Sequence, residues 1–338
     1  MTSDITATGP QTLLQMMTGY WRTQSLHSVC KLGIPDILGD ESVPFEEIAA
    51  KTGTHASSLY RVLRALASVG VFSETEPGRF HLTSLGHLLR TDREDSMHSL
   101  AIMYAEEQYK AWADLLHSVR TGTPAFDHLY GMPVFQYFAE NSEAARIFNA
   151  AMIGYTNSLA AAVVGGYDFS RFGRVVDVGG GHGALLAAIL RACPGTHGVL
   201  FELPAVAESA ATFIEAAGIG DRCQRVGGDF FVDVPAGGDA YVLEQILHDW
   251  DDDRCRAILQ TVRRTMRTDA RIIVVELVLP GGDEDFFGKW LDLHMLVMAP
   301  GGRERTLAEY EALFKSAGFA LSTVIQTQTV SVIEAEPV

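Results

Sequence analysis

The pattern of hydrophobic and polar positions changes near residue 167. Before that point, apolar residues recur at helical spacing in short segments that end at Gly or Pro. Beyond it, short apolar runs alternate with helical segments, which is typical of a parallel sheet with helices between its strands. The pattern therefore predicts a mainly helical front and then an α/β domain. The expected strands are residues 174–178, 199–202, 224–226, 240–243, 272–277, 321–325 and 330–333.

The helical front contains the outline of a winged helix. Residues 44–50 and 56–67 predict two helices joined by a turn, and residues 70–82 predict two short strands. A winged helix often binds DNA, but residues 1–100 carry more acidic than basic side chains, and phosphate recognition needs basic ones. We therefore expect this segment to pack against another protein surface as a dimerisation module.

Length and charge exclude several classes of partner. With 338 residues, two domains are expected. The formal net charge of -16 repels a nucleic-acid backbone, whereas it tolerates a cationic ligand. Residues 1–6 lack a basic segment followed by an apolar one, and no run of about 18 apolar residues occurs. These features predict a cytoplasmic protein that binds neither nucleic acid nor a membrane.

A glycine-rich loop follows the first expected strand. In the segment that begins at Asp177, the residues Gly179, Gly181 and Gly183 allow a tight turn and a close approach of the backbone to a ligand. The loop also satisfies the fingerprint of a nicotinamide dinucleotide site, with Glu202 about 20 residues further on. Glu202 would bind ribose hydroxyls under either interpretation. A tight turn without a ligand is the remaining alternative.

Two later motifs lie at the carboxyl ends of strands, where open α/β sheets bind ligands. Gly228, Asp229 and Phe230 follow the third strand, and His248 follows the fourth. With its motifs in this order, the chain resembles the class I S-adenosylmethionine-dependent O-methyltransferases of small molecules, which include plant caffeate-type and bacterial natural-product enzymes. The resemblance covers nearly the whole chain, including the winged-helix front.

The resemblance implies an architecture and a cofactor. The fold would be α/β, a Rossmann-like seven-stranded methyltransferase sheet with an N-terminal, mainly helical winged-helix dimerisation domain that forms a homodimer. Residues 1–100 would be the dimerisation domain, residues 101–166 a helical linker that contributes to the substrate pocket, and residues 167–338 the catalytic domain. The implied cofactor is S-adenosyl-L-methionine, released as S-adenosyl-L-homocysteine, and no metal is implied.

The resemblance also assigns cofactor contacts. The glycine-rich loop matches the residues beside the methionine end, the acidic residue of the second strand matches the ribose ligand, and the motif after the third strand matches the adenine site. Glu202 stands where many relatives have aspartate, and Glu244 stands where many have lysine, so the adenine-side contacts stay open. The implied cofactor-binding residues are Asp177, Gly179, Gly181, Glu202, Gly228, Asp229 and Phe230.

His248 matches the catalytic base of the family, and its chemistry supports that role. A phenol with a pKa of about 10 is a poor nucleophile at neutral pH, whereas a histidine with a pKa of about 6.5 can accept its proton. Glu276 and Glu304 match the two acidic residues that flank and orient this histidine. A carboxylate on the far ring nitrogen would stabilise the imidazolium. The alternative is a loop histidine at the start of the following helix.

Three consecutive aspartates follow this motif, at Asp251, Asp252 and Asp253. Clustered carboxylates suit Mg²⁺, so a metal site is one interpretation. Helix capping is favoured, because aspartates at a helix start complement the helix dipole. We therefore expect no metal here.

Two helical segments supply candidate walls for a substrate pocket. In the later one, three residues recur at a spacing of four on one helical face, and ordinary core packing is the alternative. The resemblance favours part of this face, together with the end of the helical front, as contacts of a small aromatic molecule with a phenol, enol or polyketide hydroxyl. The candidate residues are Asn149, Met152, Tyr155, Trp290, His294 and Met298.

Three other classes of protein remain open on the sequence. One is a winged-helix regulator with a ligand-sensing α/β domain, which the acidic front disfavours. Another is a nicotinamide-dependent oxidoreductase, which the later motifs disfavour. The third is a member of the fold that binds the cofactor without transferring its methyl group.

Overall fold

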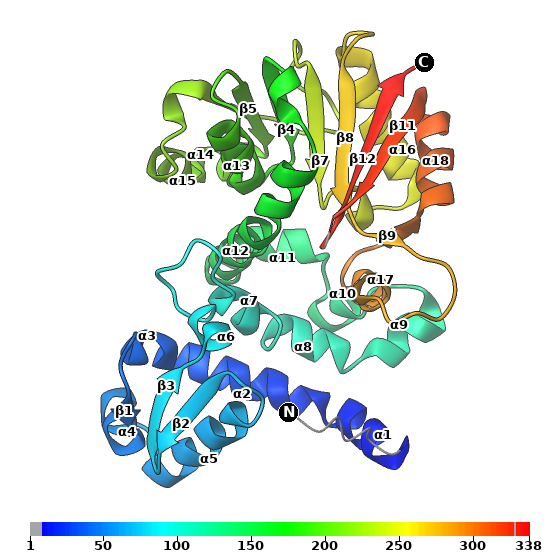
Figure 1. The fold of residues 1–338 in the computed structure, drawn as a ribbon. Helices are drawn as coiled ribbons and strands as arrows, with labels where there is room; N and C mark the ends of the chain where they lie inside the picture. The colour runs from blue at the N-terminus through cyan, green and yellow to red at the C-terminus, as the bar shows by residue number, and fades with distance from the viewer. Residues whose placement is uncertain (1–8, 328) are drawn as a thin grey trace. The chain divides into compact units, whose positions relative to one another are not determined.

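The computed structural model describes residues 9–327 and 329–338. The chain divides into two compact units, one that ends at Tyr109 and one formed by Lys110–Val338 (Figure 1). Residues 1–6, on which the expectation of no leader segment rests, lie outside the described residues.

The N-terminal unit combines helices with a small antiparallel sheet. Helix α5 buries Leu59, Leu63 and Leu66, which share one face at helical spacing. In the sheet, β3 lies between β1 and β2 and pairs with both in antiparallel fashion. Helices α4 and α5, followed by the β2–β3 hairpin, form the predicted winged helix. The elements are α1 Gly9–Met17, α2 Gly19–Lys31, α3 Ile34–Leu38, β1 Val43–Pro44, α4 Phe45–Thr52, α5 Ala56–Ala67, β2 Phe72–Glu76, β3 Arg79–Leu82, α6 Ser84–His87 and α7 His98–Met103.

Seven strands form the central sheet of the second unit, in the order β11-β12-β8-β7-β4-β5-β6. Neighbours from β6 to β8 are parallel, and β12 is antiparallel to both β8 and β11. The order reverses between β4 and β7, and ligands of such sheets bind at the carboxyl ends of the strands at this switch point. The strands confirm all seven predicted runs: β4 Arg174–Val178, β5 His197–Glu202, β6 Cys223–Gly227, β7 Ala240–Glu244, β8 Arg271–Glu276, β11 Phe319–Gln326 and β12 Ser331–Pro337.

Helices cover both faces of this sheet (Figure 1). Because alternate residues of a strand point to opposite faces, Val175 packs with α12 and α13, while Val176 packs with α16 and α18. A short parallel pair joins β9 to β10. The remaining elements are α8 Glu107–Trp112, which spans the boundary between the units, α9 Leu115–Thr121, α10 Ala125–Tyr130, α11 Val134–Glu140, α12 Ser142–Gly166, α13 Ala184–Ala192, α14 Pro204–Ser209, α15 Ala211–Ala216, α16 Asp252–Thr265, α17 Phe287–Met298, α18 Leu307–Ser316, β9 Val278–Leu279, β10 Arg305–Thr306 and 3₁₀ turns at Phe169–Arg171, Gly220–Arg222 and Leu247–Asp249.

Helix α12 is 25 residues long and apolar enough to cross a membrane by length and composition, although polar residues interrupt its apolar runs. Its packing gives a different reason for the apolar residues. Leu159 and Val163 are buried in the core on one face of the sheet, and Thr156 donates a hydrogen bond to Glu244 of β7. The apolar side of α12 thus forms part of the core of the second unit.

Candidate active site

The glycine-rich loop joins the carboxyl end of β4 to helix α13. Gly179, Gly181 and Gly183 have φ angles of 72°, 57° and 85°, in the left-handed region that favours glycine. A Cβ atom on Gly179 would lie 2.7 Å from the side chain of Ile246, so the loop also packs closely against the turn after β7. The glycines thus allow the tight turn, and they also leave space for a ligand to approach the start of α13.

Asp177 lies directly beneath this loop. Its side chain is buried, and neither carboxylate oxygen has a hydrogen-bond partner among the described residues. Burial, with the nearby carboxylates of Glu244 and Glu202, raises the pKa of Asp177 well above its usual range. An unpaired buried carboxylate is unfavourable, and a ligand that offers a donor or a positive charge would relieve this cost. The site therefore fits a cationic cofactor.

Glu202 ends β5 and holds the other side of the loop. One of its carboxylate oxygens accepts a hydrogen bond from the Gly181 amide at 3.2 Å, and the other accepts from the Leu203 amide at 2.7 Å. Burial raises the pKa of this carboxyl group. The residue therefore lies next to the loop, as expected for a ribose ligand, while it also supports the loop directly.

The motif after β6 is built mainly by packing. A Cβ atom on Gly228 would lie 2.4 Å from the Phe201 ring, so this glycine makes room for a neighbouring side chain. Asp229 accepts a hydrogen bond from the Phe231 amide at 2.8 Å, which shapes the turn. The Phe230 ring meets Trp250 edge to face at 6.3 Å between centroids. Phe230 thereby connects this motif to the turn that carries His248.

Glu244 adds a third acidic group to the switch point. It ends β7, it is half-buried, and it accepts a hydrogen bond from the Thr156 hydroxyl at 3.0 Å. Burial raises its pKa to about 7. Because β5, β4 and β7 are neighbours, Glu202, Asp177 and Glu244 gather at adjacent strand ends. This chain therefore places a third carboxyl group at a position for which the resemblance implies lysine in many relatives.

His248 is buried in a 3₁₀ turn that follows β7. Its Nδ1 atom lies 2.7 Å from Oε1 of Glu304, whose side chain is itself buried. Its Nε2 atom lies 3.7 Å from a carboxylate oxygen of Asp249. The backbone amide of Glu304 donates a hydrogen bond to Asp292 at 2.9 Å, which fixes the segment that bears the carboxylate. A carboxylate on one ring nitrogen, with the second nitrogen left to accept a proton, is the arrangement of a general base.

Glu276 contacts the backbone of the histidine turn rather than its imidazole. Oε1 accepts hydrogen bonds from the amides of Ile246, Leu247 and His248 at 3.0, 2.6 and 3.3 Å. The hydroxyl of Tyr310 donates to the other oxygen. Both glutamates therefore lie at His248, but Glu304 contacts the ring and Glu276 fixes the turn.

Sequence reasoning missed the residues on the carbonyl side of this turn. Arg305 is fully buried and donates to the carbonyl groups of Leu247 and Trp250 at 2.8 and 2.7 Å. The amide of Arg303 donates to the His248 carbonyl at 2.8 Å. Gln245, at the start of the turn, has a φ angle of 54°, the one positive value at a non-glycine residue in the described chain. In the sequence, the only sign of these contacts was the presence of an arginine on each side of Glu304.

The electrostatic setting of His248 differs from the expected one. Burial by itself lowers the pKa of the imidazole, but the carboxylates of Glu304 and Asp249 outweigh burial and raise the pKa to about 10. The expected pKa was the ordinary value of about 6.5. The correction follows from the direct contact with Glu304, because an adjacent negative charge favours the imidazolium.

The six candidate wall residues lie on two helices. On α12, Asn149, Met152 and Tyr155 are half-buried. On α17, His294 is buried and accepts a hydrogen bond from the Trp112 indole at 2.9 Å, and burial lowers its pKa to about 4. Met298 lies in an apolar cluster with Phe126, whereas Trp290 is 60% exposed.

The three aspartates after His248 have structural partners. Asp251 is the N-cap of α16 and accepts a hydrogen bond from the Arg254 amide at 2.8 Å, so the capping interpretation is confirmed. Asp252 pairs with Arg305 at 2.9 Å. Asp253 pairs with Arg256 at 2.7 Å. The carboxylates are therefore engaged by the helix start and by arginines.

Comparison with known proteins decides among the classes that the sequence left open. A family model described as an O-methyltransferase domain matches residues 112–320, and one described as an O-methyltransferase dimerisation domain matches residues 14–92. The chain belongs to the O-methyltransferase family. This O-methyltransferase uses S-adenosylmethionine, and the regulator and oxidoreductase alternatives are therefore wrong.

The similarity to individual proteins extends over nearly the whole chain. The phenazine O-methyltransferase PhzM of Lysobacter antibioticus is 55% identical over 327 residues, 96% of this chain and 96% of that protein. The crystal structure of LaPhzM matches with a TM-score of 0.94 and 54% identity, over 98% of this chain and 100% of that one. NcsB1 from neocarzinostatin biosynthesis, solved with S-adenosylmethionine and 2-hydroxy-5-methyl naphthoic acid, matches with a TM-score of 0.78 and 32% identity, over 94% and 96%.

Proposed function

We propose that this O-methyltransferase methylates a hydroxyl group of a small aromatic natural product, with His248 as the general base. The observation that carries the proposal is the buried pair of His248 and Glu304 at the turn after β7, beside the switch point of the sheet. Two relatives support the substrate class: one is named as a phenazine O-methyltransferase, and the other was solved in complex with a naphthoic acid.

In the proposed mechanism the protein positions two reactants and moves one proton. When bound, S-adenosylmethionine would supply the methyl group that is transferred to the acceptor oxygen, and S-adenosylhomocysteine would be the leaving group. In its neutral form, which is the minor form at pH 7 because the pKa is raised to about 10, His248 accepts the hydroxyl proton on Nε2, while Glu304 on Nδ1 stabilises the resulting imidazolium. Glu276 and Arg305 hold the turn through its amides and carbonyls. No step requires a metal.

The cofactor-binding residues carried by the resemblance are part of the proposal. We assign the methionine end to Asp177 and the glycine-rich loop of Gly179 and Gly181, and the ribose to Glu202. Gly228, Asp229 and Phe230 are assigned to the adenine side. The unpaired carboxylate of Asp177 supports this assignment, because the cofactor carries a sulfonium and an ammonium group. We assign the acceptor to the faces of α12 and α17 that bear the six candidate residues.

The substrate class can be tested directly with a panel of acceptors. We expect hydroxylated phenazines or naphthoates, incubated with the protein and S-adenosylmethionine, to gain the mass of one methylene group at oxygen. The same ring systems with the hydroxyl group removed are the matched controls and should stay unchanged. Methylation of the deoxygenated compounds, or turnover only with aliphatic alcohols, would contradict the proposed acceptor. Mass spectrometry of the products provides the measurement.

The acidic groups at the switch point predict pH-dependent binding of the cofactor. Since the pKa of Glu244 is about 7 and that of Asp177 is raised, both lose protons as pH rises, and the added negative charge favours a cation. The affinity for S-adenosylmethionine should increase by about tenfold between pH 5.5 and pH 8. S-adenosylhomocysteine lacks the sulfonium charge, so its affinity should change less. Isothermal titration calorimetry measures both.

A conservative variant isolates the contribution of Glu244. Glu244→Gln removes the titrating group near pH 7 and should flatten the pH dependence for S-adenosylmethionine. Glu215→Gln, at an exposed position of α15, is the matched control and should keep the wild-type profile. Equal pH dependence for the two cofactor forms would show that these carboxylates do not act on the sulfonium.

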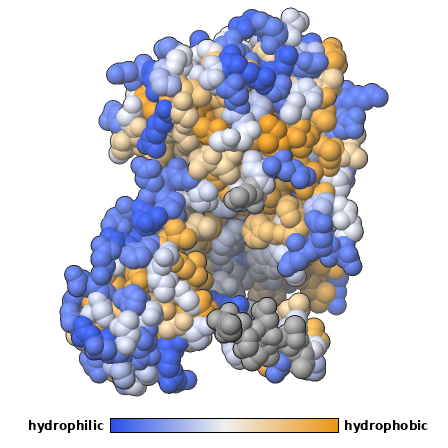
Figure 2. Space-filling model, viewed as in Figure 1, coloured by the Kyte–Doolittle hydropathy of each residue, from blue (hydrophilic) through white to orange (hydrophobic). Residues whose placement is uncertain are grey.

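We further propose a homodimer formed through the N-terminal unit and a cytoplasmic location. The matched dimerisation domain and a run of exposed apolar side chains on α1 and the start of α2 support the dimer. Apolar side chains, drawn orange, reach the visible surface of both units (Figure 2). Such exposure on a folded unit is typical of an interaction surface. On α1 and α2 the exposed residues are Leu13, Leu14, Met16, Met17, Tyr20 and Trp21.

Charged substitutions on α1 should dissociate the dimer. The double variant Leu14→Asp and Met17→Asp places two carboxylates in the proposed interface, and burying unpaired charges there is unfavourable. We expect light scattering after size-exclusion chromatography to change from the mass of a dimer to that of a monomer. Leu307→Asp, at the exposed start of α18, is the control and should stay dimeric. A double variant of unchanged mass would locate the interface elsewhere.

A further inference from the structure

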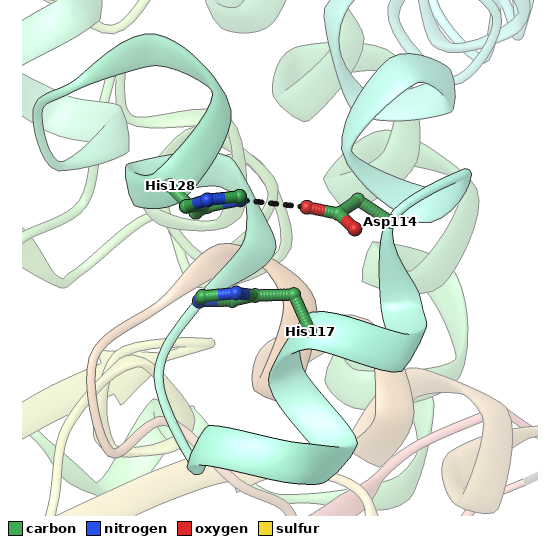
Figure 3. Close-up of side chains that lie close together, drawn as sticks. All are labelled: Asp114, His117 and His128. Atoms are coloured by element: carbon green, nitrogen blue, oxygen red, sulfur yellow. Dashed lines mark hydrogen bonds and ion pairs between the residues drawn. The ribbon is translucent and has the colours of Figure 1, made fainter.

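A group of metal-binding side chains lies on the α9–α10 hairpin of the second unit, apart from the residues of the candidate active site. Asp114 precedes α9, His117 lies one turn further along that helix, and His128 lies on α10. One ligand atom from each of the three residues lies within 4.8 Å of the others (Figure 3). The spacing of these three residues along the chain did not predict this group.

The three side chains already approach one another closely. Nδ1 of His128 lies 2.8 Å from Oδ2 of Asp114. The ring of His117 lies parallel to that of His128, with 3.9 Å between centroids and 5° between planes (Figure 3). Nε2 of His117 lies 3.0 Å from the Thr123 hydroxyl. A histidine ligand ordinarily uses its second ring nitrogen for such a hydrogen bond, which holds the ring in place.

We propose that Asp114, His117 and His128 bind a first-row transition metal ion, with Zn²⁺ as the best match. Two imidazoles and one carboxylate suit such ions, whereas Mg²⁺ and Ca²⁺ prefer sites made of oxygen ligands. Tetrahedral zinc with bonds of about 2.0 Å needs ligand atoms about 3.3 Å apart, so the two stacked imidazoles must rotate out of their parallel arrangement for their nitrogen lone pairs to converge on one ion. The side chains of His128 and Asp114 are 57% and 40% exposed, which allows these rotations and leaves room for water as a further ligand.

The ion would crosslink the hairpin that packs against α17. Phe126, between the cluster residues in sequence, is fully buried with Val297 and Met298 of that helix. Trp112, shortly before the cluster, donates its hydrogen bond to His294. The metal would therefore stabilise the hairpin that supports a proposed wall of the acceptor pocket, without taking part in methyl transfer.

Binding is tested on the full-length, tag-free protein, freed of metal with a chelator and saturated with S-adenosylhomocysteine to occupy the cofactor site. We expect calorimetry to show one Zn²⁺ per chain at micromolar affinity, no binding of Mg²⁺, and a higher melting temperature with Zn²⁺. Co²⁺ should give visible d–d absorption without a thiolate charge-transfer band, which distinguishes this cluster from the free cysteines.

Matched variants locate the ion. His117→Gln and His128→Gln should each weaken Zn²⁺ binding at least tenfold and abolish the rise in melting temperature. His197→Gln, at an exposed histidine of β5, should bind like the wild type. Melting curves without metal show that each variant is folded. No Zn²⁺ binding by the wild type, unchanged binding by both cluster variants, or equal binding of Mg²⁺ would overturn the proposal.

Discussion

His248→Ala is expected to lower turnover by about 10² to 10⁴, the usual contribution of a positioned general base. The affinity for S-adenosylmethionine should change by no more than a few-fold, because the cofactor is assigned to other residues, among them the carboxylates of Asp177 and Glu202. Turnover with a phenolic acceptor and calorimetry with the cofactor measure the two effects separately. If His248 acts only on the proton of the acceptor, turnover should fall while cofactor affinity stays nearly unchanged.

Alkaline pH should partly rescue this variant. Above the pKa of a phenolic acceptor, solvent supplies the phenolate that the imidazole would otherwise generate. His197→Ala, which removes an exposed imidazole from the same unit, is the control for a general effect of losing a histidine. Full turnover at neutral pH together with a collapse of cofactor binding would show that His248 has a structural role, and the proposed mechanism would be wrong.

Glu304→Gln should lower the maximal kcat/KM by about 10² to 10⁴ while leaving cofactor affinity within a few-fold. The carboxylate lies 2.7 Å from Nδ1 of His248, where it fixes the tautomer and stabilises the imidazolium. An amide carries no charge, and one of its two orientations presents a donor to Nδ1, which favours the wrong tautomer. The loss should therefore approach that of removing the base itself.

The pH profile distinguishes a lost electrostatic contact from a folding defect. In the wild type, Glu304 and Asp249 raise the pKa of His248 to about 10, so the imidazole is protonated at neutral pH. With an acceptor of comparable pKa, kcat/KM should rise by about tenfold per pH unit from neutrality towards that value. Without the Glu304 charge the pKa falls, and the variant should reach its lower plateau at a lower pH.

The exposed Glu311 of α18 provides the control for this shift. Glu311→Gln makes the same chemical change on the same chain and should keep both the plateau and the pH at which it is reached. A Glu304→Gln profile that parallels the wild type at every pH would show that the carboxylate acts only by holding the loop.

Glu276 contacts the backbone of the histidine turn, whereas Glu304 contacts the imidazole ring. The Glu276 carboxylate accepts from three successive amides of the histidine turn. Arg305 binds carbonyl groups of the same turn from the other side. This double support explains how Gln245 persists with a positive φ angle, since strained backbone survives where surrounding contacts determine it.

The sequence by itself determined the features that depend on neighbouring residues. Short apolar runs between helical segments predicted all seven strands, because a strand that is buried in a sheet shows its apolar residues within a few neighbouring positions. Gly179 and Gly181 occupy positive φ angles that their lack of a side chain favours. Asp251 caps α16 through an amide three residues away, and this contact needs no tertiary partner. The ordered motifs also sufficed to indicate the family.

Only the tertiary structure decided how distant residues combine. Glu304 meets His248 from 56 positions away, and Glu276 lies 28 positions from it, so their contacts depend on strand order and loop paths rather than on local pattern. The raised pKa of His248 follows from that proximity, which no periodicity encodes. The hairpin cluster of His117 and His128 arises in the same way, because the fold back of α10 onto α9 brings the two rings together.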